Sequence, residues 1–289
     1  MRSNKIHNVD LFTQAANDNF QKHVKTQSKQ ALEIINKKMN WTRLLQPIER
    51  AVAKERSGGS SAGRSAMDLL VIVKCFLLQS IYNLSDPRLE EEIADRRSFQ
   101  IFLGLSSNDA IPDETTICRY RELFARLGLD KKLFEGFNRQ LTELGLIIGK
   151  GTIVYATTQI VHTADFTPAH IPDSRLFDAM LLGSERRVYA DKGYASAKRS
   201  RALTQQGIRC SIMFRAARAH PLSAQQKQIN RRLSTIRSAV ERPFAFLKRI
   251  LGYTRCRYYD LSRNRFQFLL ALIVYNIRRS ITLRIPRWT

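Results

Sequence analysis

The C-terminal third of the sequence almost lacks acidic residues. Between Arg186 and Thr289 there are only three, Asp191, Glu241 and Asp260, against 24 lysines and arginines. The first 185 residues hold 24 basic and 22 acidic residues, so this third carries +21 of the net charge of +23. A surface this basic favours a polyanionic partner, and nucleic acid is the default candidate.

Closely spaced cysteines, long apolar runs and an apolar N-terminus are missing as well. No CxxC pair occurs and the four cysteines lie about forty or more residues apart, which argues against a zinc site and favours free thiols in a reducing cytosol. The longest apolar run, Leu69–Leu78, is interrupted by Lys74 and is too short for a membrane span of about 20 residues. Met1–Asn19 is polar, which argues against a secretory signal. We therefore expect a cytoplasmic protein with no membrane partner.

What is present is the composition of a globular protein, with 44% apolar and 25% charged residues. A chain of 289 residues buries a sizeable core and favours two domains. Three segments are expected. Residues 1–64 form a polar, weakly helical extension that ends in the flexible run Gly58–Gly63. Residues 65–148 form a helical domain, and residues 149–289 form a strongly basic domain with strands and helices.

The helical domain has clear start signals. Met67–Tyr82 has the pattern of a buried helix, and Ser85-Asp86-Pro87 predicts a helix start with Asp86 as its cap. A second start lies at Pro112-Asp113-Glu114, and an amphipathic helix is expected over Lys132–Leu144. A helix-turn-helix DNA reader and an ordinary helical bundle both fit this pattern, because paired helices are common.

After Lys150 the sequence alternates strand and helix patterns, which predicts an α/β domain. Strands are expected at Thr152–Thr157, Val161–Ala164, Arg186–Asp191 and Ile208–Phe214. Helices are expected at Gln225–Arg249, where Pro243 is unusual, and at Phe266–Ile277.

Two of the three acids stand where phosphodiester chemistry would use them. Asp191 ends a predicted strand, so its side chain would emerge at a sheet edge. Glu241 follows Arg237 by four residues, so both lie on one helix face. Hard Mg²⁺ or Mn²⁺ ions need carboxylate oxygens, usually from three acids. The alternatives are a turn-forming Asp191 and an ordinary ion pair between Arg237 and Glu241, and the residues alone favour neither interpretation.

Five segments, taken in order, resemble the conserved blocks of bacterial insertion-sequence transposases of the "five" family. Two of them are similar to that family's N-terminal helical region, and three are similar to its catalytic blocks. They are Leu84–Glu90 and Ala110–Arg119, then Gly151–Val154, Val188–Tyr194 and Arg237–Phe244. The resemblance covers roughly residues 65–280.

This resemblance implies a ribonuclease-H-like fold with an Asp-Asp-Glu triad that binds two Mg²⁺ or Mn²⁺ ions. Asp191 matches the second acid and Glu241 the third, so both would be catalytic metal ligands. The resemblance also implies phosphate contacts for Arg237 and Lys248, which match the basic residues beside the family's Glu. Arg242 and Lys192, next to the two acids in the sequence, are further candidates for DNA contacts. The implied partner is the double-stranded DNA of the element's terminal repeats, bound by a homo-oligomer on the bacterial nucleoid.

The chain departs from the family pattern at the first acid. Relatives carry Gly-Thr-x-Val-Asp-Ala-Thr, whereas Tyr155 stands here in the place of the Asp. A phenol with a pKa of about 10 is a poor Mg²⁺ ligand at neutral pH. The chain is also short between Tyr155 and Asp191, which predicts an incomplete sheet with exposed edges. Asp165, Asp173 and Asp178 are available as substitutes, but proline-broken loops make that role unfavourable.

We therefore expect a transposase homologue with a defective active site that retains DNA binding. The alternatives are a non-catalytic DNA-binding protein that inhibits transposition, an unrelated nucleic-acid-binding protein, and a decayed product that does not fold stably. One further motif stays open. Tyr253, Tyr258 and Tyr259 alternate with Arg255 and Arg257, which fits base stacking beside a phosphate track and fits a solvated surface equally well.

Overall fold

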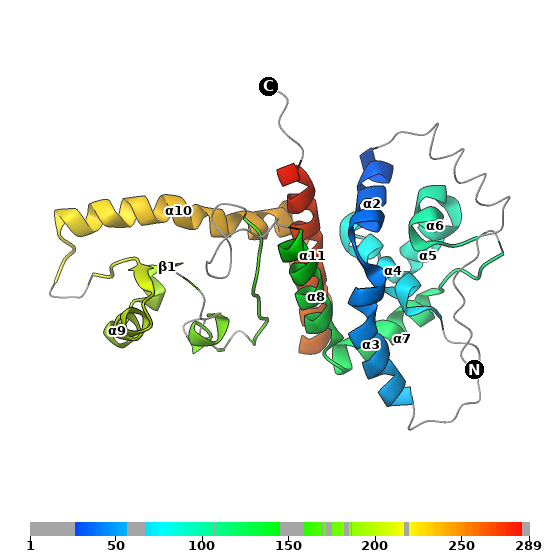
Figure 1. Ribbon diagram of the computed structural model, residues 1–289, viewed down its shortest axis with the longest axis horizontal. Coiled ribbons are helices and arrows are strands. Elements are labelled where there is room, and N and C mark those ends of the chain that lie inside the picture. Colours follow the sequence, from blue (N-terminus) through cyan, green and yellow to red (C-terminus); the bar gives the residue numbers. More distant parts are fainter. Residues whose placement is uncertain are drawn as a thin grey trace. The chain divides into compact units, whose positions relative to one another are not determined.

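The structure is a computed structural model that describes residues 27–56, 67–106, 108–144, 159–168, 170–171, 175–181, 185, 187–216 and 220–284. The chain divides into two compact units (Figure 1). The N-terminal unit is Met1–Gln140 together with Ser262–Val274. The C-terminal unit is Leu141–Leu261 together with Tyr275–Thr289. Each is described by itself below.

Helices make up the described part of the N-terminal unit. They are α2 (Gln27–Lys38), α3 (Trp41–Arg56), α4 (Leu69–Tyr82), α5 (Asp86–Asp95), α6 (Arg97–Leu103), α7 (Glu114–Arg126), α8 (Leu129–Glu143) and the first part of α11 (Leu261–Arg284). Helix α4 is the centre of this unit, because it packs against α3, α5, α6 and α7. Its eight successive residues Val71–Leu78 are all buried, as expected for a helix that is apolar on every side.

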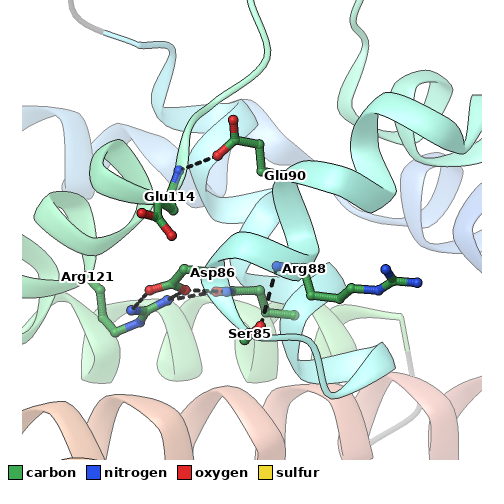
Figure 2. A network of polar contacts seen from close by, with 7 residues as sticks. Ser85, Asp86, Arg88, Glu90, Glu114 and Arg121 are labelled. Carbon is green, nitrogen blue, oxygen red and sulfur yellow. Dashed lines mark hydrogen bonds and ion pairs between the residues drawn. The ribbon is translucent and has the colours of Figure 1, made fainter.

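The predicted helix at Met67–Tyr82 is thereby confirmed, as are the start at Asp113 and the helix near Lys132–Leu144. Asp113 caps α7 by accepting a hydrogen bond from the backbone N–H of Thr116 at 2.6 Å. The prediction that Asp86 caps its helix is wrong. Ser85 is the cap of α5, and its hydroxyl accepts from the N–H of Arg88 at 3.4 Å (Figure 2).

Asp86 does not cap because a buried arginine takes its carboxylate. Arg121 of α7 is 5% exposed and donates from both guanidinium nitrogens to Asp86, with one Nη1–Oδ2 distance of 2.6 Å (Figure 2). The same guanidinium donates to the Gln79 side chain of α4 at 2.9 Å. This Arg121 network therefore ties together α4, α5 and α7. Nearby, Glu90 accepts from the N–H of Glu114 at 2.8 Å, which adds a second link between α5 and α7.

A lysine also lies in the core of this unit. Lys74 of α4 is 5% exposed, and its ammonium lies 5.1 Å from the ring centroid of Trp41 and 5.4 Å from that of Phe102. Burial lowers the pKa of Lys74 to about 8, and the nearby charge of Asp68 opposes that shift. The residue that interrupts the apolar run in the sequence is therefore a core residue, stabilised by cation–π contacts.

The C-terminal unit has a small parallel sheet. Strands β1 (Arg187–Ala190) and β2 (Arg209–Ile212) pair in parallel with Val188 opposite Cys210, and α9 (Ala197–Gln205) connects them. Two 3₁₀ turns flank β1, η2 (Asp178–Met180) and η3 (Lys192–Tyr194). Their core is Phe177, Val188, Leu203 and Ile208. Both strand predictions for this region are confirmed, with shorter bounds.

The rest of this unit is helical or irregular where it is described. Helix α10 (Ala224–Arg249) is continuous through Pro243, as predicted, and begins with a capping box of Ser223 and Gln226. The α/β prediction thus holds for a two-stranded parallel sheet within a mostly helical structure. The strand expected at Thr152–Thr157 lies outside the described residues.

The strand expected at Val161–Ala164 is wrong beyond a single bridge residue, Val161. A side chain takes the place of a neighbouring strand there. Asn276 of α11 is fully buried, donates to the carbonyl of Val161 at 2.7 Å and accepts from its N–H at 2.9 Å. The hydroxyl of Tyr275 donates to the carbonyl of Gln159 at 2.7 Å. Side chains of α11 thus satisfy the backbone groups that a sheet would otherwise pair.

Two further expectations concern thiols and membranes. All four cysteines are free thiols, with Cys75 buried and Cys256 exposed. Within the described ranges, no single helix is long and apolar enough to cross a membrane, and α4 with α5 meets that test only as a pair bent by 101°.

Candidate functional site

Asp191 lies at the carboxyl end of β1, where the sequence placed it. Its backbone is extended, and its side-chain Oδ1 accepts from the N–H of Lys192 at 2.7 Å. Its carbonyl accepts from the N–H of Tyr194 at 3.0 Å, which closes η3. The turn-forming role is therefore present. The carboxylate also lies at the carboxyl end of a strand in a parallel sheet, where ligands commonly bind. The position of Asp191 therefore also fits a role in a functional site.

Glu241 lies on α10 and is exposed. Helix α10 packs against β1, so the two acids belong to elements that touch each other. Helical spacing places Glu241 and Lys248 on one face of α10, because seven residues are close to two turns. Lys248 and Arg242 are exposed on α10, and Lys192 is exposed beside Asp191. Arg237 is a residue of α10 whose side chain lies outside the described part of the structure.

A two-metal centre needs a third carboxylate that can bridge the ions. In the parts of the chain that the structure describes, no three His, Cys, Asp or Glu side chains gather in a group that could hold a metal ion. Asp165 accepts from the N–H of Phe166 at 2.9 Å. Asp178 has a side chain 77% exposed and faces Arg199 at 3.7 Å. Tyr155 and Asp173 lie outside the described residues.

The carboxylates that the structure describes around Asp191 and Glu241 therefore do not fit a pair of Mg²⁺ ions. Two carboxylates, one of which already accepts a backbone N–H, leave a bridging position without an acid. We derive no reaction step through a metal from this arrangement. What the site retains is a strand-end carboxylate and a helix that carries one acid among many cations.

Helix α10 carries further cations besides Arg237 and Lys248. Lys227, Arg231, Arg242 and Arg249 are all exposed. At 100° per residue these four fall within about 60° of one another around the helix. We call them the basic stripe. The buried residue Leu247 lies about 160° away from Arg231, so the stripe faces away from the core contact of the helix.

The stripe is long and its helix is anchored. Lys227 and Arg249 are 22 residues apart, which is about 33 Å along an α-helix. Near its start, Asn230 accepts from the N–H of Phe214 at 2.9 Å and donates to the carbonyl of Phe214 at 3.0 Å. Near its end, the ring of Phe246 packs edge-on against Tyr275 at 5.4 Å between centroids. The four cations are separated by near multiples of the helical period of 3.6 residues, and this pattern in the sequence indicates a shared helix face.

Two family models match the sequence in succession. "Transposase domain (DUF772)" matches residues 18–123, and "Transposase DDE domain" matches residues 131–277. The second match covers just over half of the 289 residues and includes Asp191, Glu241 and the whole of α10. No solved structure matches the chain.

Proposed function

Because this chain belongs to the transposase DDE domain family, we propose that it binds the double-stranded DNA at the ends of an insertion sequence and does not cleave it. Intact relatives cut and join DNA strands with a pair of divalent metal ions held by three acids. In this chain the first of those acids is replaced by Tyr155, and Asp191 and Glu241 are left as a pair.

The basic stripe on α10 is the observation that carries the binding half of this proposal. Its four exposed cations extend over about 33 Å, close to the length of one turn of B-DNA, about 34 Å. Exposed cations distributed along one helix face can contact several phosphates of a duplex and release their counterions. Lys192 follows Asp191 directly and Lys248 shares a helix face with Glu241, and both are exposed, so they add positive charge to the surface that would bind DNA.

The second part of the proposal, that the chain does not cleave DNA, rests on the chemistry of the metal ligands. The tyrosine hydroxyl ionises only near pH 10 and cannot bridge two ions as a carboxylate does. Asp165 and Asp178 make other contacts and do not complete a group of three with the surviving pair, within the described residues. Mg²⁺ or Mn²⁺ binding is therefore weakened, and we assign Asp191 and Glu241 no reaction step.

A second function follows from the same features. A homologue that occupies element ends without cutting them would inhibit intact transposase, either by blocking the ends or by joining mixed oligomers on the DNA. Binding of this kind depends on salt and not on metal. Its site of action would be the nucleoid in the bacterial cytoplasm.

Neutralising the stripe tests the binding half. The triple change of Arg231, Arg242 and Arg249 to glutamine should reduce the slope of log K against log salt by about 3, since each phosphate contact contributes about 0.9. The measurement is fluorescence anisotropy with duplex DNA from the element's end, at several salt concentrations.

The matched control removes the same charge from the same unit. Lys198, Arg201 and Arg209 are exposed and lie on α9 and β2 rather than on α10. Their change to glutamine should leave most of the slope intact. Equal losses in both triple variants would mean that net charge alone drives binding, and the stripe would lose its role.

A further inference from the structure

The loop between α10 and α11 borders an open hollow that none of the roles above uses. It has a volume of about 720 Å³ and is lined only by residues from the stretch Gly252–Tyr259. Small-ligand pockets range over about 300–1,000 Å³, so this hollow is large enough for an organic ligand. The lining contains two arginines, two tyrosines and one cysteine, and no acid. Its chemistry is therefore cationic and aromatic at once.

The loop is held in place where it leaves α10. Leu251 is buried, and the N–H of Tyr253 donates to the carbonyl of Leu247 at 2.9 Å. Gly252 has a φ of +63°, a conformation that a side chain would strain, and its carbonyl accepts from the N–H of Thr254 at 2.9 Å. Tyr253 is half-buried and does not line the hollow. Of the three tyrosines in this stretch, Tyr253 therefore holds the start of the loop through its backbone N–H, and Tyr258 and Tyr259 line the hollow.

The lining residues other than the half-buried Tyr258 are exposed to solvent. Tyr259 is fully exposed, with a relative exposure of 112%, and Arg255 and Arg257 are exposed as well. A tyrosine ring left wholly in water forgoes the large apolar contact that this side chain usually makes. A flat ring and two guanidinium groups around one hollow are the groups that bind a base and its phosphate.

We propose that this hollow binds an unpaired nucleotide at a DNA end, with Tyr259 stacked on the base and Arg255 and Arg257 on the flanking phosphates. The inference rests on the proposed function, because it assumes that DNA is the partner. A base within a duplex has both faces covered by its neighbours, so its face reaches a tyrosine ring only when the base is unstacked. The loop therefore distinguishes frayed or single-stranded ends from the paired DNA that the basic stripe contacts.

The preference for unpaired DNA ends can be measured by comparing the Kd of the protein for two DNAs. One is a blunt duplex, and the other is the same duplex with three unpaired nucleotides at one end. We expect the unpaired tail to tighten binding roughly tenfold, the usual order for one stacked base. Tyr259→Ala should abolish that preference and leave the Kd for the blunt duplex unchanged, whereas Tyr259→Phe should keep it, since stacking needs the ring alone. Leu261→Ala, an exposed residue outside the lining, should change neither value.

Cys256 gives a direct test of position. It lines the hollow and is exposed, whereas Cys75 is buried and Cys118 and Cys210 are half-buried. We expect the Cys256 thiolate to attack an oligonucleotide that carries a mixed disulfide with a small thiol on a base of the unpaired tail. The exchange forms a protein–DNA disulfide and releases the small thiol, and Cys256→Ser should prevent it. The same mixed disulfide placed on a paired base at the centre of the duplex should react far less.

The outcomes separate the two proposals. Blunt-duplex binding with no tail preference, or with a preference that Tyr259→Ala leaves intact, would overturn the role of the hollow and leave the proposed function standing. Equal cross-linking to the tail and to the duplex centre would overturn it too. Absence of any salt-dependent duplex binding would instead refute the proposed function.

Discussion

Replacing Asp86 by alanine should lower the free energy of unfolding of the N-terminal unit by about 3–5 kcal/mol, the usual cost of breaking a buried ion pair from one side. The change removes the bidentate carboxylate from the Arg121 guanidinium, which is 5% exposed, while its hydrogen bond to Gln79 remains. The network joins three helices, so its loss weakens α4, α5 and α7 together (Figure 2).

The stability that Asp86 contributes should also depend on pH, and the direction of this dependence follows from the pKa of Asp86. Burial alone would raise the pKa of Asp86, but the hydrogen bonds and charge of Arg121 outweigh it, so the pKa is lowered. A carboxyl whose pKa is lower when folded contributes stability that is complete above its unfolded value of about 3.9. That contribution is lost as the pH falls through the folded pKa. The stability difference between the wild type and Asp86→Ala should therefore shrink in acid.

The free energies of unfolding can be measured by urea denaturation, followed by the fluorescence of Trp41. All variants carry Trp288→Phe, so that Trp41 is the one tryptophan. Glu91→Ala is the matched control, because the pair of Arg88 and Glu91 on α5 is about 60% exposed on both sides and such pairs contribute at most about 1 kcal/mol. If Asp86→Ala were as mild as Glu91→Ala, the network would have no special role in stability.

The second large effect concerns Lys74. Its pKa of about 8 in the folded chain lies below the ordinary value of 10.5, so the unfolded chain binds this proton more tightly. Between pH 8 and 10.5 the wild type should therefore gain stability as the pH rises, by about 3 kcal/mol at 1.36 kcal/mol per pKa unit. Below pH 8 both states are protonated and the full cost of the buried charge remains.

Lys74→Met supplies the reference, because methionine fills the same volume without a charge. Subtracting its unfolding free energy from that of the wild type at each pH cancels the titration of all other groups. The difference should move in favour of the wild type from pH 7 to pH 10.5. A difference that stays flat over this range would show that the ammonium lies in water and not against Trp41 and Phe102.

Local patterns in the sequence predicted most elements, because their signals are contained within one segment. The apolar run Leu69–Leu78 lies in α4, the strand predicted to end at Asp191 is β1, and the helix start predicted at Pro112-Asp113-Glu114 is that of α7. Helix α6 was not predicted, because its seven residues are too few to show a period of 3.6.

Long-range partners set the remaining features. Asp86 was predicted to cap its own helix, and Arg121, 35 residues away, overrides that local preference. Nothing near Val161 indicates that Asn276, 115 residues later, takes its hydrogen bonds. At the candidate site the sequence located both acids and their elements. Of the basic stripe, the sequence singled out only Arg242. Arg231 and Arg249 lie on a different face of α10 from Glu241 and Lys248.

Strand cleavage tests the central claim most directly. Purified full-length protein is incubated with DNA that carries the ends of its own element, in Mg²⁺ and in Mn²⁺, beside the variant Asp191→Ala. The proposed function predicts salt-dependent binding in both reactions and no nicking above background in either. Metal-dependent cleavage by the wild type that Asp191→Ala abolishes would contradict it, because two surviving carboxylates would then suffice for the chemistry.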